Sequence, residues 1–172
     1  MSGQSSIDEI LLFIMRHGEA ESLRIDDKSR QLTAIGREQA VTSSQWLVEH
    51  YCPEAQIDLA LVSPYRRTRQ TFDMITLDLN VQDCTICADI TPDGDPRFAH
   101  DYIDALLDTA MKNGKAPQFF MIVSHMPFVS FFLDEVCSEP ASALFATGSV
   151  AVVRYNLNTH KGELVSHFQG LL

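Results

Sequence analysis

The fold is decided by residues 10–18, Ile10-Leu11-Leu12-Phe13-Ile14-Met15-Arg16-His17-Gly18. Six consecutive apolar residues have the length and composition of a strand that is buried on both faces of a parallel sheet. The run stops abruptly at an arginine, a histidine and a glycine. A second apolar run, Phe119 to Val123, has the same character and stops at Ser124 and His125. The repeated pattern predicts two buried strands, each followed closely by a histidine.

Helices are expected to alternate with further strands along the chain. Thr33 is a suitable N-cap for a helix that ends near His50. Pro64 occupies the position that proline favours at the start of a helix, here one that ends near Leu77. The remaining expected elements are strands at 58–62 and 84–88, a turn at 91–96, helices at 98–111 and 128–136, and strands at 150–155 and 163–168 around a turn at 158–162.

This alternation predicts an α/β fold with three layers, α/β/α, around a mostly parallel central sheet with an antiparallel edge hairpin. Ligands of such sheets bind at the carboxyl ends of the strands. Three expected strands end in polar residues, namely Arg16-His17, Ser63 to Arg67, and Ser124-His125. We therefore expect these residues to form one site along one edge of the sheet.

Length and composition favour a single domain over residues 1–172, with a flexible start over residues 1–9. The chain has 172 residues, of which 45% are hydrophobic, enough for a substantial core. Its net charge of −10 disfavours nucleic acid and anionic membranes as partners. Residues 1–70 carry 8 Lys or Arg against 10 Asp or Glu, whereas residues 71–172 carry 5 against 13. A site for an anion would therefore draw its cations mainly from the first part.

The sequence also predicts a cytoplasmic protein without bound metal or cofactor. No positive region resembles a signal peptide, and no apolar run approaches the ~20 residues that span a bilayer. A domain of this size does not need disulfides, so reduced thiols are the simpler expectation for its 4 cysteines. Cys84 and Cys87 form a C-x-x-C pair, but no second pair completes a zinc site.

The residue types at the expected edge suit a phosphoryl group. Arg16 precedes the first histidine, and Arg66, Arg67 and Arg69 follow the strand at 58–62. An arginine fork matches the oxygens of a tetrahedral dianion through bidentate, charge-assisted hydrogen bonds. A lone histidine at a strand end is more often structural than catalytic, but two histidines at equivalent strand ends favour a shared site.

Four blocks of the sequence resemble, in the same order, the motifs of the histidine phosphatase superfamily. They are an R-H-G block, an L-T-x-x-G block followed by Q-A, an S-P-x-x-R-x-x-Q-T block and an S-H-x-P block. The short chain and its T-P-D-G-D turn look most like the SixA-type phosphohistidine phosphatase branch. The four blocks and the turn lie at Phe13–Glu19, Leu32–Gly36 with Gln39-Ala40, Val62–Thr71, Val123–Pro127 and Thr91–Asp95.

The resemblance implies a phosphoglycerate mutase-like fold and a metal-independent phosphatase that forms a covalent phosphohistidine on His17. Carried over onto this sequence, Arg16, His17, Arg67 and His125 make the catalytic phosphate pocket. The other two arginines near Arg67 would then face solvent. Neutral His17 would be the nucleophile, with its second ring N–H held by a carbonyl such as that of Gly18. Protonated His125 would stabilise charge on the phosphoryl oxygens.

The branch resemblance further implies a phosphohistidine-bearing partner protein as substrate, such as a histidine-phosphotransfer domain, and we expect the protein to act as a monomer. Larger relatives use a carboxylic acid after the third strand to protonate an ester leaving group. Asp89, Asp93 and Asp95 lie in that region, and the sequence assigns the role to none of them. Two alternatives stay open: a small-molecule phosphomonoesterase or mutase of the same superfamily, and a non-catalytic phosphate-binding module.

A charged segment, Glu21 to Arg30, flanks the expected site. Its cations Arg24, Lys28 and Arg30 could contact an incoming phosphate, although a solvated loop is the simpler interpretation. Arg30 lies just before the Leu32-Thr33 helix start, which makes it the strongest substrate-binding candidate of the three.

Overall fold

The computed structural model describes residues 8–22, 26–141 and 143–170 of the chain. Most of the start that we expected to be flexible, residues 1–7, lies outside this range. Glu9 does not fit that expectation, because it begins the first strand. The strand order across the sheet is β3-β2-β4-β1-β5-β6. The six strands are β1 Glu9–Arg16, β2 Gln56–Val62, β3 Asn80–Ile86, β4 Phe119–Ser124, β5 Val150–Asn156 and β6 Lys161–Phe168.

Four of these strands are parallel to one another, and the last two form the expected antiparallel hairpin. Parallel pairing joins β1 to β4, β4 to β2, and β2 to β3. The strand β5 runs antiparallel to both β1 and β6. Because β1, β2 and β4 all point the same way, their carboxyl ends meet at one edge of the sheet, as the sequence predicts.

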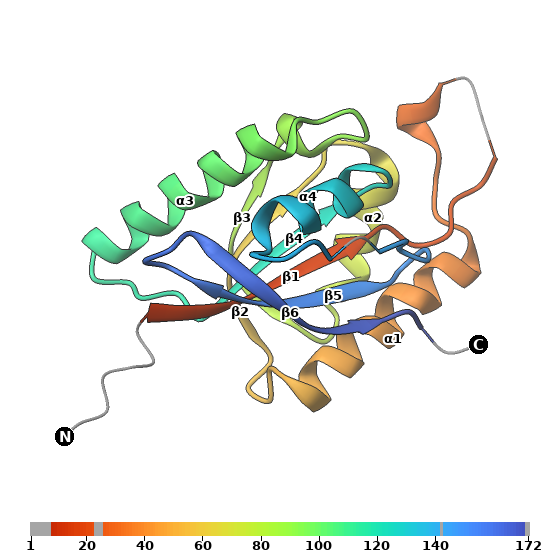
Figure 1. The fold of residues 1–172 in the computed structure, drawn as a ribbon. Helices are drawn as coiled ribbons and strands as arrows, with labels where there is room; N and C mark the ends of the chain where they lie inside the picture. Colours follow the sequence, from red (N-terminus) through yellow and green to blue (C-terminus); the bar gives the residue numbers. More distant parts are fainter. Residues whose placement is uncertain (1–7, 23–25, 142, 171–172) are drawn as a thin grey trace.

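Helices cover both faces of the sheet, which confirms the three-layer α/β/α architecture (Figure 1). One face packs against α3 and α4, and the other against α1 and α2. The side chains of β1 point alternately to the two faces of the sheet. Leu12 and Ile14 pack toward α3 and α4, and Phe13 and Met15 pack toward α1 and α2. The helices are α1 Ala34–His50, α2 Arg66–Ile75, α3 Pro96–Lys112 and α4 Phe128–Val136, with short 3-10 turns η2 Asp27–Ser29 and η3 Ala88–Ile90.

Several element boundaries differ from the sequence expectation; for example, α3 starts at Pro96 and not at 98, and β2 starts at Gln56 and not at 58. The third strand covers Asn80–Ile86 rather than 84–88, because it is an edge strand whose polar, exposed residues hide the strand pattern. The helix α2 starts at Arg66, with Tyr65 as its N-cap, so Pro64 lies in the preceding loop and not at the first helical position. The hairpin turn is shorter than expected, since β6 already starts at Lys161. Thr33 caps α1 as expected, by accepting a hydrogen bond from Gly36 N at 3.0 Å.

Other composition-based expectations can be compared with the described residues. Within this part of the chain, no helix is long and apolar enough to cross a membrane. The four cysteines are free thiols, and Cys84 is the exposed one. Among the residues that the structure describes, no group of three or more His, Cys, Asp or Glu is arranged to hold a metal ion.

The start of α1 packs directly on the turn that follows β1, and two glycines allow this contact. A Cβ atom on Gly36 would lie 2.0 Å from the carbonyl oxygen of Glu19. A Cβ atom on Gly18 would lie 2.3 Å from the carbonyl oxygen of Gly36. Both distances are far below van der Waals contact, so only glycine fits at either position. The glycines of the R-H-G and L-T-x-x-G motifs therefore form one backbone contact.

We expect Gly36→Ala to destabilise the protein by about 3 kcal/mol, because the added methyl group must push one backbone segment off another. Denaturant unfolding measures this loss. Ile35→Ala on the same helical turn is the control, since Ile35 is 54% exposed and its truncation should cost no more than about 0.5 kcal/mol. Equal stability of the Gly36→Ala variant and the wild type would show that the two segments can separate freely.

Candidate active site

The carboxyl ends of β1, β2 and β4 bring the predicted residues together. His17 follows β1 and its backbone N–H donates to Ser124 O, at the end of β4, at 3.0 Å. Ser63 follows β2 and donates from its backbone N–H to Val123 O at 3.1 Å. Because three neighbouring strands are hydrogen-bonded up to their last residues, the side chains that follow them are held on a rigid edge.

His17 is buried and held in one tautomer. Its Nδ1 lies 2.7 Å from the carbonyl oxygen of Gly18, so Nδ1 carries the proton and donates it, as expected from the sequence. Its Nε2 then has a free lone pair, which accepts a hydrogen bond from Arg67 Nε at 3.3 Å. Burial lowers the pKa of His17 to about 3; the bond to Gly18 opposes this shift, and the charge of Arg67 adds to it. Nε2 of His17 therefore carries no proton at neutral pH.

Arg67 is the arginine of α2 that points into the site. Its side chain is 4% exposed, whereas Arg66 and Arg69 are exposed, as the family motif implies. Its guanidinium lies 5.0 Å from the centre of the Tyr65 ring, a cation–π contact. Its Nη1 donates to Asp27 O at 2.7 Å, and its Nη2 lies 3.2 Å from Asp27 Oδ2. Together with the bond from Nε to His17, these contacts engage all three guanidinium nitrogens.

His125 lies beside His17 in surroundings that disfavour its protonated form. The two ring centres are 5.2 Å apart, and His125 Nε2 lies 2.7 Å from Ser63 Oγ. Burial, the neighbouring His17 and the charge of Arg67 together lower the pKa of His125 to about 2. This lowered pKa does not favour the protonated His125 that the family motif implies for the transition state. Its cause is desolvation among fixed cations, which a motif does not show.

Two buried nitrogen atoms at this edge have no hydrogen-bond partner among the described residues. They are Nδ1 of His125 and Nε of Arg16. The terminal Nη1 of Arg16 donates to Phe145 O at 2.7 Å, so that side chain is anchored at its tip. A buried polar atom without a partner costs stability, and a bound oxyanion would satisfy both atoms. In that complex Ser63 would donate to His125 Nε2, leaving Nδ1–H to donate to the anion.

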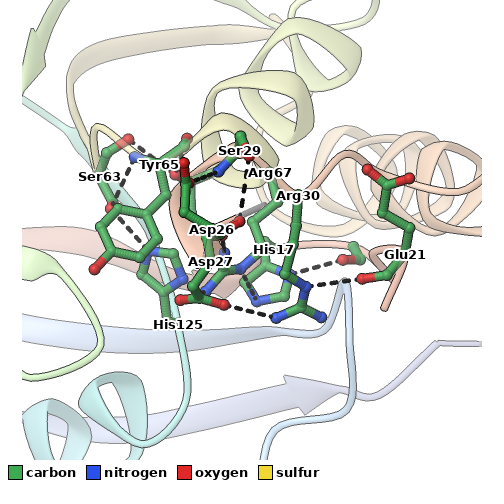
Figure 2. A network of polar contacts seen from close by, with 12 residues as sticks. His17, Glu21, Asp26, Asp27, Ser29, Arg30, Ser63, Tyr65, Arg67 and His125 are labelled. Atoms are coloured by element: carbon green, nitrogen blue, oxygen red, sulfur yellow. Dashed lines mark hydrogen bonds and ion pairs between the residues drawn. The ribbon is translucent and has the colours of Figure 1, made fainter. Parts of the chain in front are cut away.

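The charged segment before α1 contributes the carboxylate of Asp27 and the guanidinium of Arg30 to the same network (Figure 2). Arg30 donates from Nε to Glu21 O at 2.8 Å and pairs through Nη1 with Asp27 Oδ1 at 3.0 Å. Its charge contributes to the lowered pKa values of both His17 and His125. Lys28 is exposed, and Arg24 lies outside the described residues.

The sequence reasoning missed several residues of this network. Asp27 lies in a segment where the sequence points only to the cations, although Asp26 is a recognisable N-cap of the turn that presents Asp27. Ser63 lies at this edge as expected, but the sequence does not predict its hydrogen bond with His125. Thr71 connects the site internally, because its hydroxyl accepts from Gly18 N at 3.0 Å and donates to Arg67 O at 2.8 Å. Its place in the Q-T motif was the available signal.

The three candidate general acids of the third-strand region lie outside this network. Asp89, Asp93 and Asp95 are exposed, and Asp95 caps α3 by accepting from Arg97 N at 2.9 Å. Across the described ranges, no hydrogen bond or ion pair connects any of the three with His17.

We expect the free energy of unfolding to fall as the pH drops below about 6.5, the ordinary pKa of histidine. His17 and His125 have pKa values of about 3 and about 2 in the folded protein. Below about pH 6.5 these two side chains therefore bind more protons in the unfolded chain than in the folded protein. Each histidine contributes a loss of about 1.4 kcal/mol per pH unit at most. Denaturant unfolding between about pH 7 and about pH 5 measures the slope, and His125→Asn should reduce it. An unchanged slope in this variant would contradict the lowered pKa.

The fold and the site define an α/β protein with two histidines and two arginines gathered at the carboxyl edge of its sheet, and it is similar to known proteins. The model of the histidine phosphatase superfamily (branch 1) matches residues 12–90. A phosphohistidine phosphatase SixA homolog of Haemophilus influenzae is 34% identical over 161 residues, covering 91% of this chain and 93% of that protein. Phosphohistidine phosphatase SixA of Escherichia coli K12 is 29% identical over 143 residues, 83% of each chain.

A solved structure is similar over nearly the whole chain. The protein histidine phosphatase SixA complexed with tungstate superposes with a TM-score of 0.82 at 26% sequence identity, covering 92% of this chain and 96% of that chain. This chain belongs to the histidine phosphatase superfamily and, within it, to the SixA branch. The predicted phosphoglycerate mutase-like fold is thereby confirmed.

Proposed function

We propose that this protein is a phosphohistidine phosphatase, which removes the phosphoryl group from a phosphohistidine side chain of a partner protein. The observation that carries the proposal is the state of His17: Nδ1 is fixed on the Gly18 carbonyl at 2.7 Å, which leaves Nε2 unprotonated beside the Arg67 guanidinium. The similarity to SixA phosphohistidine phosphatases over most of the chain supports the substrate class.

In the first step of the proposed reaction, Nε2 of His17 attacks phosphorus while the bond from phosphorus to the substrate imidazole breaks. Arg16, Arg67 and His125 donate to the three non-bridging oxygens in a loose transition state. The buried Nε of Arg16 and Nδ1 of His125, which lack partners among the described residues, are suited to two of these bonds. The displaced imidazole takes its proton from water.

In the second step, a water molecule attacks the phosphorus of the phosphohistidine on His17. The bond from phosphorus to Nε2 breaks, inorganic phosphate leaves, and the proton of the water passes to solvent. His17 returns to the same tautomer because the Gly18 carbonyl still holds Nδ1–H. The resting state of the enzyme is thereby restored.

The position of the carboxylates favours a phosphoramidate over a phosphate ester as substrate. An alkoxide leaves poorly and needs a general acid, whereas an imidazole leaves more readily. Asp89, Asp93 and Asp95 have no contact with His17, and Asp27 is paired with arginines and has a lowered pKa. The contacts of these four carboxylates therefore do not favour an ester leaving group.

The proposal also covers the partner protein, the oligomeric state and the cellular location. A histidine-phosphotransfer domain presents its phosphohistidine on a protein surface and is the partner that we propose. Because Arg16, His17, Arg67 and His125 all come from one chain, a monomer suffices for activity. The four free thiols are consistent with a cytoplasmic location.

The test is a comparison of substrates with the purified protein. Release of phosphate is measured from a phosphohistidine-bearing protein, from free phosphohistidine, and from sugar phosphates and phosphoglycerate. We expect a kcat/KM at least about 100-fold higher for the phosphohistidine protein than for any ester. A clear preference for an ester would replace the proposal by a phosphomonoesterase, and binding of phosphate without turnover of any substrate would indicate a non-catalytic module.

A further inference from the structure

The guanidinium that should receive the phosphoryl group is already occupied by a carboxylate of the same chain. Two of the three nitrogens of Arg67 bind Asp27, through its backbone oxygen at 2.7 Å and its Oδ2 at 3.2 Å. The third nitrogen binds His17. Three of the five N–H groups of the Arg67 guanidinium are therefore engaged by groups of the same chain.

The contacts of Asp27 resemble those that an oxyanion would make. Its carboxylate bridges two cations, with Oδ2 on Arg67 and Oδ1 on Arg30 at 3.0 Å (Figure 2). Partial burial raises the pKa of Asp27, but the hydrogen bond from Arg30 and the charge of Arg67 outweigh it, so the pKa lies below its ordinary value. Asp27 is therefore negatively charged in the pocket at neutral pH.

The carboxylate is positioned so that it can leave. The side chain of Asp27 is 45% exposed, in contrast to the 4% of Arg67. It belongs to the short turn η2, which is held by the cap from Asp26 Oδ1 to Ser29 N at 2.9 Å and buries no residue. An ion pair with one half-exposed partner is weaker than a fully buried pair, because solvent screens it. Rotation of this single side chain would free Nη2 of Arg67 without disturbing the sheet edge, while Nη1 keeps its bond to the backbone oxygen of Asp27.

We propose that Asp27 is an affinity-determining residue of the phosphate pocket, whose carboxylate occupies the Arg67 fork until a substrate phosphoryl group displaces it. This inference rests on the proposed function for the identity of the substrate but not for the competition itself. A phosphate dianion cannot share the fork with an ionised carboxylate, because the two anions repel. The occupied state therefore lowers the apparent affinity for every anion that needs Arg67.

The same competition affects the product. Inorganic phosphate leaves a pocket in which Asp27 returns to the arginine, so release of the product is favoured. A phosphorylated protein contacts the enzyme beyond the phosphoryl group, whereas free phosphate must displace Asp27 with its contacts in the pocket alone. Displacement of Asp27 thus lowers the affinity for both kinds of ligand, and a macromolecular substrate offsets this loss with its additional contacts.

The experiment compares the affinity for inorganic phosphate in the wild type and in Asp27→Asn, by NMR titration or calorimetry at constant ionic strength. If the fork is occupied about 90% of the time, the variant should bind phosphate about tenfold more tightly. Asp27→Glu, which keeps the charge, should stay near the wild type. If Asp27→Asn does not fold, Asp27→Ser serves the same purpose.

Asp26→Asn is the matched control, because it removes the same charge one residue away, while asparagine keeps the ability to cap the turn. Its phosphate affinity should stay within about twofold of the wild type. Unchanged phosphate affinity in Asp27→Asn would overturn the proposal, since the anion would then bind without displacing the carboxylate. Weaker binding would also overturn it, because Asp27 would then hold Arg67 in place for the phosphate.

The KM for a phosphohistidine protein provides an independent readout, and it should fall together with the dissociation constant for phosphate in Asp27→Asn. If the wild type hydrolyses no phosphohistidine but Asp27→Asn still binds phosphate more tightly, the proposed function fails and the role of Asp27 stands. If phosphohistidine is hydrolysed but the affinity for phosphate does not change, the role of Asp27 fails and the proposed function stands.

Discussion

Replacing His17 with alanine is expected to abolish turnover of phosphohistidine, with a loss in kcat of about 10⁴-fold or more. The loss is this large because His17 Nε2 is the unprotonated nitrogen that Arg67 and Gly18 position at the end of β1. Without it the covalent step has no nucleophile, and the remaining cations can only bind the substrate. Single-turnover assays with a radiolabelled phosphohistidine protein measure the rate.

The covalent intermediate gives a second readout for this variant. The wild type should acquire acid-labile, base-stable phosphate during turnover, and His17→Ala should acquire none. His50→Ala is the matched control, because His50 is an exposed histidine at the end of α1 and its removal should leave kcat within about twofold. Labelled phosphate on the folded His17→Ala protein would assign the nucleophile to another residue.

Much of the fold could be predicted because the decisive strands are apolar on both faces. β1 and β4 are continuous apolar runs, and each ends at a motif that contains a histidine. Parallel pairing of β1, β4 and β2 then follows from the helices between them, and it brings their carboxyl ends to one edge. The convergence of His17 and His125 needed no more information than strand identity and strand direction.

The rest depends on features that a single sequence does not display. The edge strand β3 has mostly polar, exposed residues, so its start at Asn80 could not be recognised from an apolar pattern. The neutral state of His125 results from burial among cations that come from distant segments. The place of Asp27 in the pocket depends on how the turn η2 folds back toward α2, which no local periodicity encodes.

Replacing Arg67 with lysine is expected to lower kcat/KM by about 10²–10³-fold, almost as much as replacement with alanine. The positive charge alone is not enough, since Arg67 uses its planar group in three directions at once. It donates to His17 Nε2, contacts Asp27 with both terminal nitrogens, and lies over the Tyr65 ring. Lysine has one nitrogen and cannot present a fork to two phosphoryl oxygens.

The pH dependence separates this role from general loss of structure. Since the charge of Arg67 helps to lower the pKa of His17, Arg67→Ala should raise that pKa, and activity should begin to fall at a higher pH on the acid side. Arg67→Lys, which keeps the charge, should show a smaller shift. Arg66→Lys and Arg69→Lys are the matched controls, because both side chains are exposed on the same helix, and each should retain kcat/KM within about twofold. Near-wild-type activity of Arg67→Lys would mean that the pocket needs a point charge, and the geometric account of the arginine fork would then be wrong.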